Sequence, residues 1–153
     1  MVLDSLSELK ALLTFGTRLM GLDVGSKTVG LALSDVTRMV ATPLETLRRT
    51  KFTKDALALR KIFEEHEVAG LIVGLPISMD GTEGPRCQST RQFAANLLEY
   101  VDLPLAFWDE RMSTMVVQRV LTEEADLSRR RRAQLVDKLA AAYILQGALD
   151  AMG

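Results

Sequence analysis

Three acidic residues from distant parts of the chain occupy positions where a buried apolar residue would be expected. Asp23 interrupts the apolar run "RLMGLDVGSKTVGLALS", Glu110 follows the apolar segment "LPLAFWD", and Asp137 lies in "DKLAAAYILQGAL". In an α/β sheet, ligands gather at the carboxyl ends of parallel strands, and both Asp23 and Glu110 are expected there. The three residues are therefore candidates for one shared site.

Asp137 is expected to face the core from a long C-terminal helix. At about 100° per residue, Asp137 continues the apolar stripe that includes Ala141 and Ile144. Ser128 is a suitable cap for this helix, which would run to about Leu149. We expect Asp137 near the helix N-terminus, where the helix dipole offsets part of the cost of its charge. That placement also allows a purely structural role.

Buried carboxylates become favourable when several of them share a divalent cation. A set of hard oxygen ligands without histidine or thiolate indicates Mg²⁺ or Mn²⁺ rather than zinc. Such ions activate a water molecule and stabilise the leaving oxygen in the hydrolysis of phosphate esters. We therefore predict that Asp23, Glu110 and Asp137 are metal ligands and catalytic residues.

Several cations are candidates for binding a phosphate backbone. Arg86 lies at an expected helix start after the Gly-rich loop "GLPISMDGTEGPR", where free N–H groups favour an anion. Basic residues also cluster at 48–54 and at 129–132. The alternative is that these charges only solvate the surface. The predicted substrate-binding residues are Lys27, Arg86, Arg111, Arg129, Arg130, Arg131 and Arg132.

The composition predicts one globular domain of 153 residues. The net charge of −1 argues against indiscriminate coating of nucleic acid, so the local basic clusters matter more than the total. The single cysteine excludes an internal disulfide and favours the cytoplasm. We find no basic leader segment and no apolar run long enough for a membrane helix, so no membrane partner is expected.

Hydrophobic periodicity predicts an α/β domain with one mixed sheet. Residues 1–17 would be an N-terminal extension with a short helix, and residues 18–153 a single domain that carries the predicted hydrolysis of phosphate esters. The expected strands cover 18–24, 28–34, 38–47, 68–76 and 103–110. The expected helices cover 4–13, 53–66, 85–100, a short one capped by Ser113 or Thr114 and ending at Leu121, and the C-terminal one.

Four segments in order resemble the YqgF/RuvX family of the ribonuclease H-like fold. They are "GLDVGSKTVGLALSD", "VGLPISMDGTEGPR", "WDERMST" and "DKLAAAYILQGAL", and together they span residues 18–150. The resemblance implies a five-stranded sheet with three antiparallel strands first, and metal-binding roles for Asp23, Glu110 and Asp137. The family often has a basic residue where Thr28 stands and a leucine where Met112 stands.

The resemblance implies a metal-dependent endonuclease that processes the 5′ end of pre-16S rRNA in ribosome biogenesis. The alternative substrate is a Holliday junction in DNA, which requires paired cuts and hence a homodimer, whereas an RNA-trimming enzyme can work as a monomer. A non-catalytic RNA-binding module of ribosome maturation is a third hypothesis. A sugar-kinase or actin-like ATPase fragment is a fourth, because "DVGSKTVG" also resembles a phosphate-binding hairpin.

Overall fold

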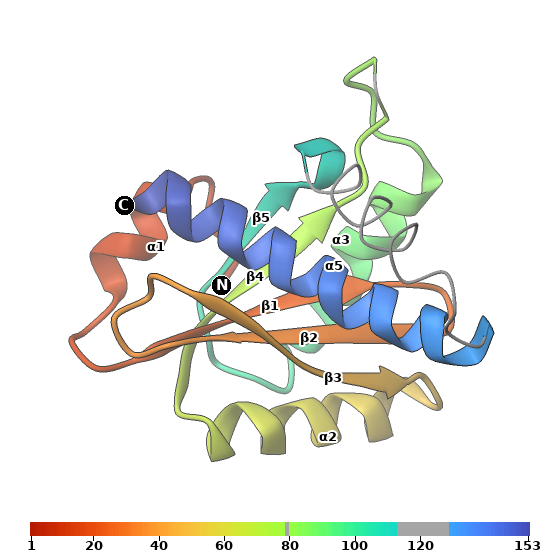
Figure 1. Cartoon of the computed structure of the whole chain (residues 1–153), viewed down its shortest axis with the longest axis horizontal. Helices are drawn as coiled ribbons and strands as arrows, with labels where there is room; N and C mark the ends of the chain where they lie inside the picture. The colour runs from red at the N-terminus through yellow and green to blue at the C-terminus, as the bar shows by residue number, and fades with distance from the viewer. Residues whose placement is uncertain (79, 113–128) are drawn as a thin grey trace.

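One mixed sheet forms the centre of the computed structural model, which describes residues 1–78, 80–112 and 129–153, and for 112 and 129–136 the backbone only. The strand order is β3-β2-β1-β4-β5 (Figure 1). β1, β2 and β3 are antiparallel neighbours, while β4 and β5 run parallel to β1. The strands are β1 (Arg18–Val24), β2 (Thr28–Ser34), β3 (Ala41–Arg48), β4 (Val68–Leu75) and β5 (Leu105–Asp109). The predicted fold class, with three antiparallel strands followed by two parallel ones, is confirmed.

The hairpin of β1 and β2 has the predicted bounds. Both strands are almost fully buried because helices cover the two faces of the sheet. The N–H group of Gly25 donates to the carbonyl oxygen of Thr28 at 2.8 Å and closes the turn. The end of β1 and the start of β2 are thereby held together, directly after Asp23.

The third strand begins later than the sequence predicted. Residues 35–40 form a turn in which the Asp35 carboxylate accepts hydrogen bonds from the N–H groups of Met39 and Val40, at 2.8 and 3.2 Å. Arg38 adopts a positive φ of 55° there. These local hydrogen bonds compete with strand pairing. Residues 39 and 40 are apolar, so the hydrophobic pattern assigned them to the strand and gave no sign of the turn.

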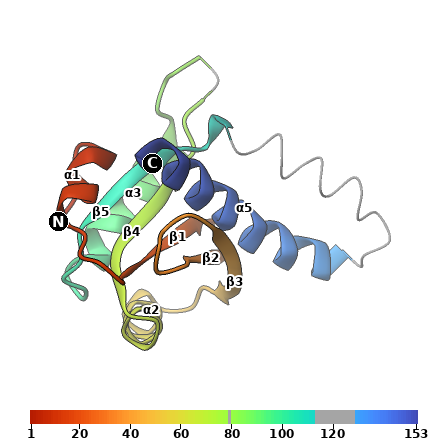
Figure 2. The same ribbon diagram turned by 60° about the vertical axis from the view of Figure 1, so that its left-hand side comes forward.

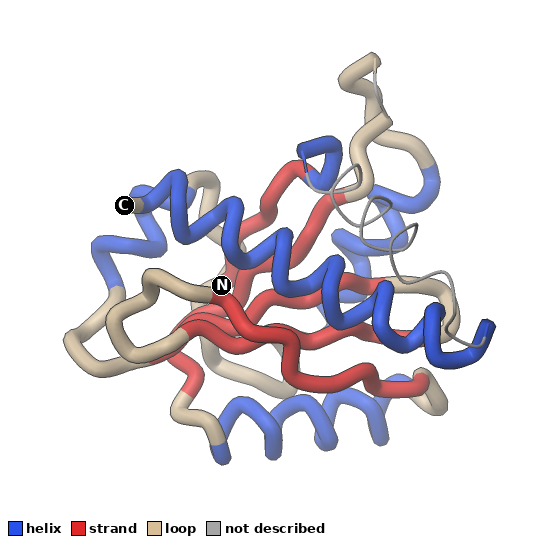
Figure 3. Tube along the Cα trace, in the orientation of Figure 1, coloured by secondary structure: helices blue, strands red, loops and turns tan. Residues whose placement is uncertain are grey.

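Helices cover both faces of the sheet (Figure 2). The longest, α5, packs across β1, β2 and β3, and its apolar side chains form one core cluster with Leu19, Ile72 and Ala106. α2 and α3 contribute Leu59 and Phe93 to the cluster on the opposite face. The helical elements are α1 (Leu6–Leu12), α2 (Phe52–Glu65), α3 (Pro85–Leu97), the 3₁₀ turn η1 (Glu110–Met112) and α5 (Arg129–Met152), shown in blue in Figure 3.

The predicted N-terminal helix corresponds to α1, capped by the Ser5 hydroxyl, which accepts from the Glu8 N–H. Leu9 is fully buried in the α5-side core. Ahead of α1, the N–H of Leu3 donates to the carbonyl of Leu105, so the first residues pair with β5. The N-terminal segment therefore packs against the sheet. None of the helices in the described ranges is long and apolar enough to cross a membrane.

Candidate active site

The three acidic residues converge on the α5 face of the sheet. Asp23 is the penultimate residue of β1 and pairs with Gly30 of β2. A side chain at Gly30 would overlap the backbone carbonyl of Asp137, so α5 lies directly on β2 beside Asp23. Glu110 follows β5, and a methyl group at Gly74 of β4 would lie 2.5 Å from Glu110 Oε1. Because Gly30 and Gly74 have no side chains, Asp137 and Glu110 can approach the sheet close to Asp23.

Asp23 and Glu110 form a carboxyl pair, joined by a hydrogen bond between their side chains. The pKa of Asp23 is raised to about 8, mainly by burial and then by the neighbouring charge of Glu110, by that hydrogen bond and by the charge of Asp137. Arg86 opposes the shift with its positive charge. At neutral pH, Asp23 therefore retains a proton that a bound cation would displace.

The sequence predicted Asp137 near the N-terminus of its helix, and this prediction is wrong. α5 begins at Arg129, so Asp137 lies in the third turn, where the helix dipole contributes little. Its Oδ2 atom instead accepts a hydrogen bond from the Thr28 hydroxyl at 2.6 Å. The carboxylate is stabilised by a side chain of the sheet.

The three carboxylates are not arranged around one common position where a metal ion could bind all of them. Among the residues that the structure describes, no three acidic, histidine or cysteine side chains are arranged as a ready metal cluster. Asp23 and Glu110 contact each other, and Asp137 lies close enough for its charge to act on Asp23. The oxygen-only donor set nevertheless fits a hard divalent cation, because repulsion within this group is the cost that such a cation removes.

Two of the predicted substrate-binding cations, Arg86 and Lys27, are exposed near the carboxyl end of β1. Arg86, exposed in the first turn of α3, acts electrostatically on Asp23. Lys27 is exposed in the turn between β1 and β2, and its carbonyl oxygen accepts from the Arg49 N–H at 2.8 Å. Both cations therefore flank the end of β1.

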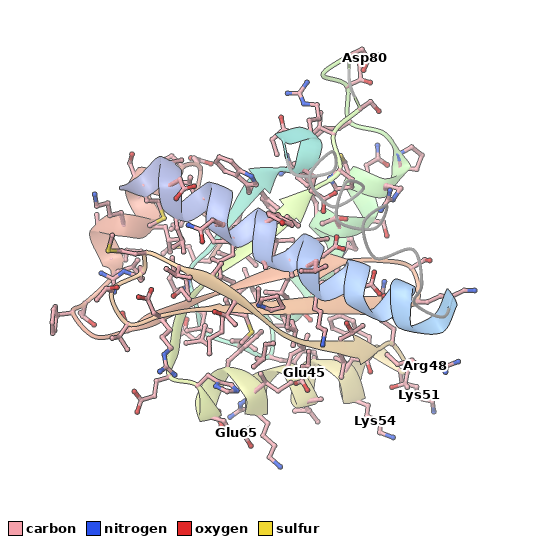
Figure 4. All side chains as sticks on the ribbon, viewed as in Figure 1. Glu45, Arg48, Lys51, Lys54, Glu65 and Asp80 are labelled. Carbon is pink, nitrogen blue, oxygen red and sulfur yellow. The ribbon has the colours of Figure 1, made fainter. Side chains whose placement is uncertain are left out.

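Arg111 is engaged by its neighbour. Its guanidinium group donates to both carboxylate oxygens of Asp109: Nε lies 3.1 Å from Oδ1 and 2.8 Å from Oδ2, and Nη2 lies 2.5 Å from Oδ2. The hydrogen bond to Asp109 raises the pKa of Arg111. Arg111 lies near the loop between β4 and α3, whose Asp80 is labelled in Figure 4.

The second basic cluster is placed only by its backbone. Arg129, Arg130, Arg131 and Arg132 form the first turn of α5, two turns before Asp137. Ser113, Thr114, Leu121 and Ser128, with the helix expected between 114 and 121, lie outside the described residues.

Three residues that build the site, Thr28, Gly30 and Arg49, were not predicted from the sequence. Thr28 contacts Asp137, and Gly30 admits the α5 backbone. Arg49, counted as part of a basic cluster, donates from Nη1 to the Gly25 carbonyl at 2.6 Å and lies over the Phe93 ring. A glycine inside a buried strand signals close backbone approach, so Gly30 was detectable. Thr28 and Arg49 carry no comparable signal.

The strand order, the helices on both faces and the acidic residues at the strand ends define a ribonuclease H-like nuclease fold. The T. thermophilus RuvC structure in complex with a Holliday junction substrate superimposes with a TM-score of 0.53 at 14% identity, over 90% of this chain and 96% of that one. The fowlpox virus resolvase bound to Holliday junction DNA gives a TM-score of 0.50 at 10% identity, over 89% and 97%.

Sequence comparison defines the family. Residues 17–151 match the family model RuvX, described as Holliday junction resolvase, and the chain belongs to this family. A Paramagnetospirillum magneticum protein named "Putative pre-16S rRNA nuclease" is 62% identical over 94% of this chain and 92% of its own length. A Phenylobacterium zucineum protein of the same name is 60% identical over 98% and 97%. The family and these names denote nucleases, so the predicted enzyme class is confirmed, and family membership argues against the ATPase-fragment hypothesis.

Proposed function

We propose that this protein is a cytoplasmic, metal-dependent endonuclease that processes the 5′ end of pre-16S rRNA. The observation that carries the proposal is the hydrogen-bonded pair of Asp23 and Glu110, with Asp137 beside it, at the carboxyl ends of β1 and β5. A nucleic-acid phosphate would be repelled by this group unless a cation were present. We take the RNA substrate from the names of the relatives that are 62% and 60% identical to this chain.

In this proposal, Asp23, Glu110 and Asp137 hold Mg²⁺ or Mn²⁺ through their carboxylate oxygens. When bound, the metal supplies an activated water and stabilises the leaving oxygen of the phosphodiester. Asp23 would be the central ligand because it interacts with both of the others: it is hydrogen-bonded to Glu110, and the charge of Asp137 raises its pKa. Loss of the Asp23 proton would accompany metal binding.

The cations around the pair would hold the nucleic-acid backbone. Lys27 and Arg86 flank the end of β1, and the arginines at 129–132 begin the helix that carries Asp137. Arg111, oriented by Asp109, would meet a phosphate from the side of η1. These contacts are electrostatic, so substrate binding should weaken steeply with salt.

Cleavage of a Holliday junction is the second candidate function, and the description of the matching family favours it. Paired cuts in a junction require two active sites, so this function calls for a homodimer, whereas RNA trimming proceeds with a monomer. Solution mass, measured with and without a four-way junction, separates the two. A non-catalytic RNA-binding role would instead require that the chain bind RNA without metal and cut neither substrate.

The decisive experiment compares cleavage of a pre-16S rRNA fragment and of a four-way DNA junction by one preparation, with Mg²⁺ and with Mn²⁺. We expect metal-dependent cutting of the RNA, and loss of at least about 100-fold in rate for Asp23→Asn because the central ligand is removed. Asp4→Asn, an exposed substitution in the N-terminal segment, is the matched control and should cut at the wild-type rate. Equal rates for Asp23→Asn and wild type would refute the mechanism.

A further inference from the structure

Thr28 and Asp137 are joined by a hydrogen bond across 109 positions of the sequence. The Thr28 hydroxyl donates to Asp137 Oδ2 at 2.6 Å, and both residues are half-buried. A hydrogen bond to an ionised carboxylate is stronger than one between neutral groups. The contact therefore restrains the orientation of the Asp137 carboxylate.

The backbone of Thr28 is held where this bond requires it. The carbonyl of Thr28 accepts from Gly25 at 2.8 Å, in the turn that follows Asp23. Alternation along β2 places Thr28 on the same face as Gly30, the cross-strand partner of Asp23. The hairpin that carries Asp23 thus also carries the group that orients Asp137.

We propose that Thr28 is a positioning residue that holds the Asp137 carboxylate in place to share a divalent cation with Asp23 and Glu110. Without the bond, repulsion from the Asp23 and Glu110 pair would favour rotation of the Asp137 carboxylate away from it. Threonine suits this role because its β-branched side chain restricts χ1 and so fixes the hydroxyl. The inference rests on the proposed metal-dependent function.

The competing interpretation is that the bond only fastens α5 to the sheet. A purely structural bond affects stability and leaves the metal affinity of the folded protein unchanged. A positioning bond affects metal affinity, because partners that orient a ligand typically change affinity by about 10- to 100-fold. Metal binding is therefore the discriminating measurement.

The experiment titrates Mn²⁺ into wild type, Thr28→Val and Thr28→Ser, with free Mn²⁺ measured by electron paramagnetic resonance. Valine has nearly the shape of threonine without the hydroxyl, and serine retains the hydroxyl. We expect Thr28→Val to bind Mn²⁺ about tenfold more weakly and Thr28→Ser to remain within about threefold of wild type. The Mg²⁺ concentration for half-maximal cleavage should rise in parallel, with KM for RNA unchanged.

The matched control is Thr37→Val. The Thr37 hydroxyl donates to Asp35 in the turn between β2 and β3, so this variant also removes a threonine-to-aspartate bond, at the opposite end of β2 from Thr28. It should bind Mn²⁺ as wild type does. In the Asp137→Asn background, Thr28→Val should cause no further loss, because Thr28 acts through Asp137.

Wild-type Mn²⁺ affinity in folded Thr28→Val would overturn the positioning role while leaving the proposed nuclease intact. A tenfold loss in Thr28→Ser would overturn it as well, and that variant decides the question if Thr28→Val does not fold. Failure of the wild-type protein to bind Mn²⁺ would instead overturn the proposed metal-dependent function, on which the inference depends.

Discussion

At the level of single residues, the folded structure disfavours the ionised form of Asp23. Its pKa is raised from 3.8 to about 8, first by burial and then by Glu110. Folding therefore retains a proton that the unfolded chain releases near pH 4. Between about pH 4 and 8 the native state binds more protons than the unfolded state, so the free energy of unfolding must fall as pH rises through this window.

This effect is testable in metal-free protein. In EDTA, wild type should lose more than about 1 kcal/mol of stability relative to Asp23→Asn between pH 5 and pH 8, as measured by urea unfolding. The lowered pKa values of Asp35 and Asp109 act in the opposite sense, but their contributions are lost only as pH falls through more acidic values. Parallel pH profiles for the two proteins would contradict the assignment of the shift to Asp23.

At the level of helices and strands, the hydrophobic pattern predicted the bounds of the buried β1 and β2, but it did not predict the turn between β2 and β3. β1 and β2 were predicted to the residue because each is a short apolar run between turn residues. The start of β3 was not, since Asp35 binds the backbone of the preceding turn. Asp137 was correctly expected to face the sheet, but its partner Thr28 is 109 positions away and lies outside any periodic signal.

The contact of α5 with β2 gives a prediction at the same scale. Gly30→Ala should destabilise the protein by about 1–3 kcal/mol or more, because the new methyl group would overlap the Asp137 backbone, which cannot rotate away as a side chain can. Cleavage should fall as well, since α5 carries Asp137. Thermal unfolding measures the first effect and the cleavage assay the second.

Gly84→Ala is the matched control for this substitution. Gly84 precedes α3, has a φ of −92°, and would place its methyl group in open space. It should leave the melting temperature nearly unchanged. Similar destabilisation by the two variants would show that close packing at Gly30 is not the cause.

At the scale of the whole molecule, the near-neutral chain concentrates basic residues beside the site. Arg48 pairs in register with Thr28, and Arg49 donates to the Lys27 carbonyl, so the end of β3 adjoins the turn after Asp23. Arg48, Lys51 and Lys54 are exposed there and lie close together in Figure 4. A nucleic-acid strand that reaches Asp23 can therefore continue along these cations.

Replacing Arg48, Lys51 and Lys54 together by alanine should weaken binding of a pre-16S rRNA fragment by about tenfold or more at low salt. It should also reduce the slope of log affinity against log salt by roughly 2, because each phosphate contact in a single strand contributes about 0.7. Fluorescence anisotropy across a salt series measures both. Lys61→Ala, exposed toward the other end of α2, is the control and should keep the wild-type slope. An unchanged slope in the triple variant would show that the nucleic-acid backbone does not bind along these three residues. The arginines at 129–132 would then be the next residues to replace.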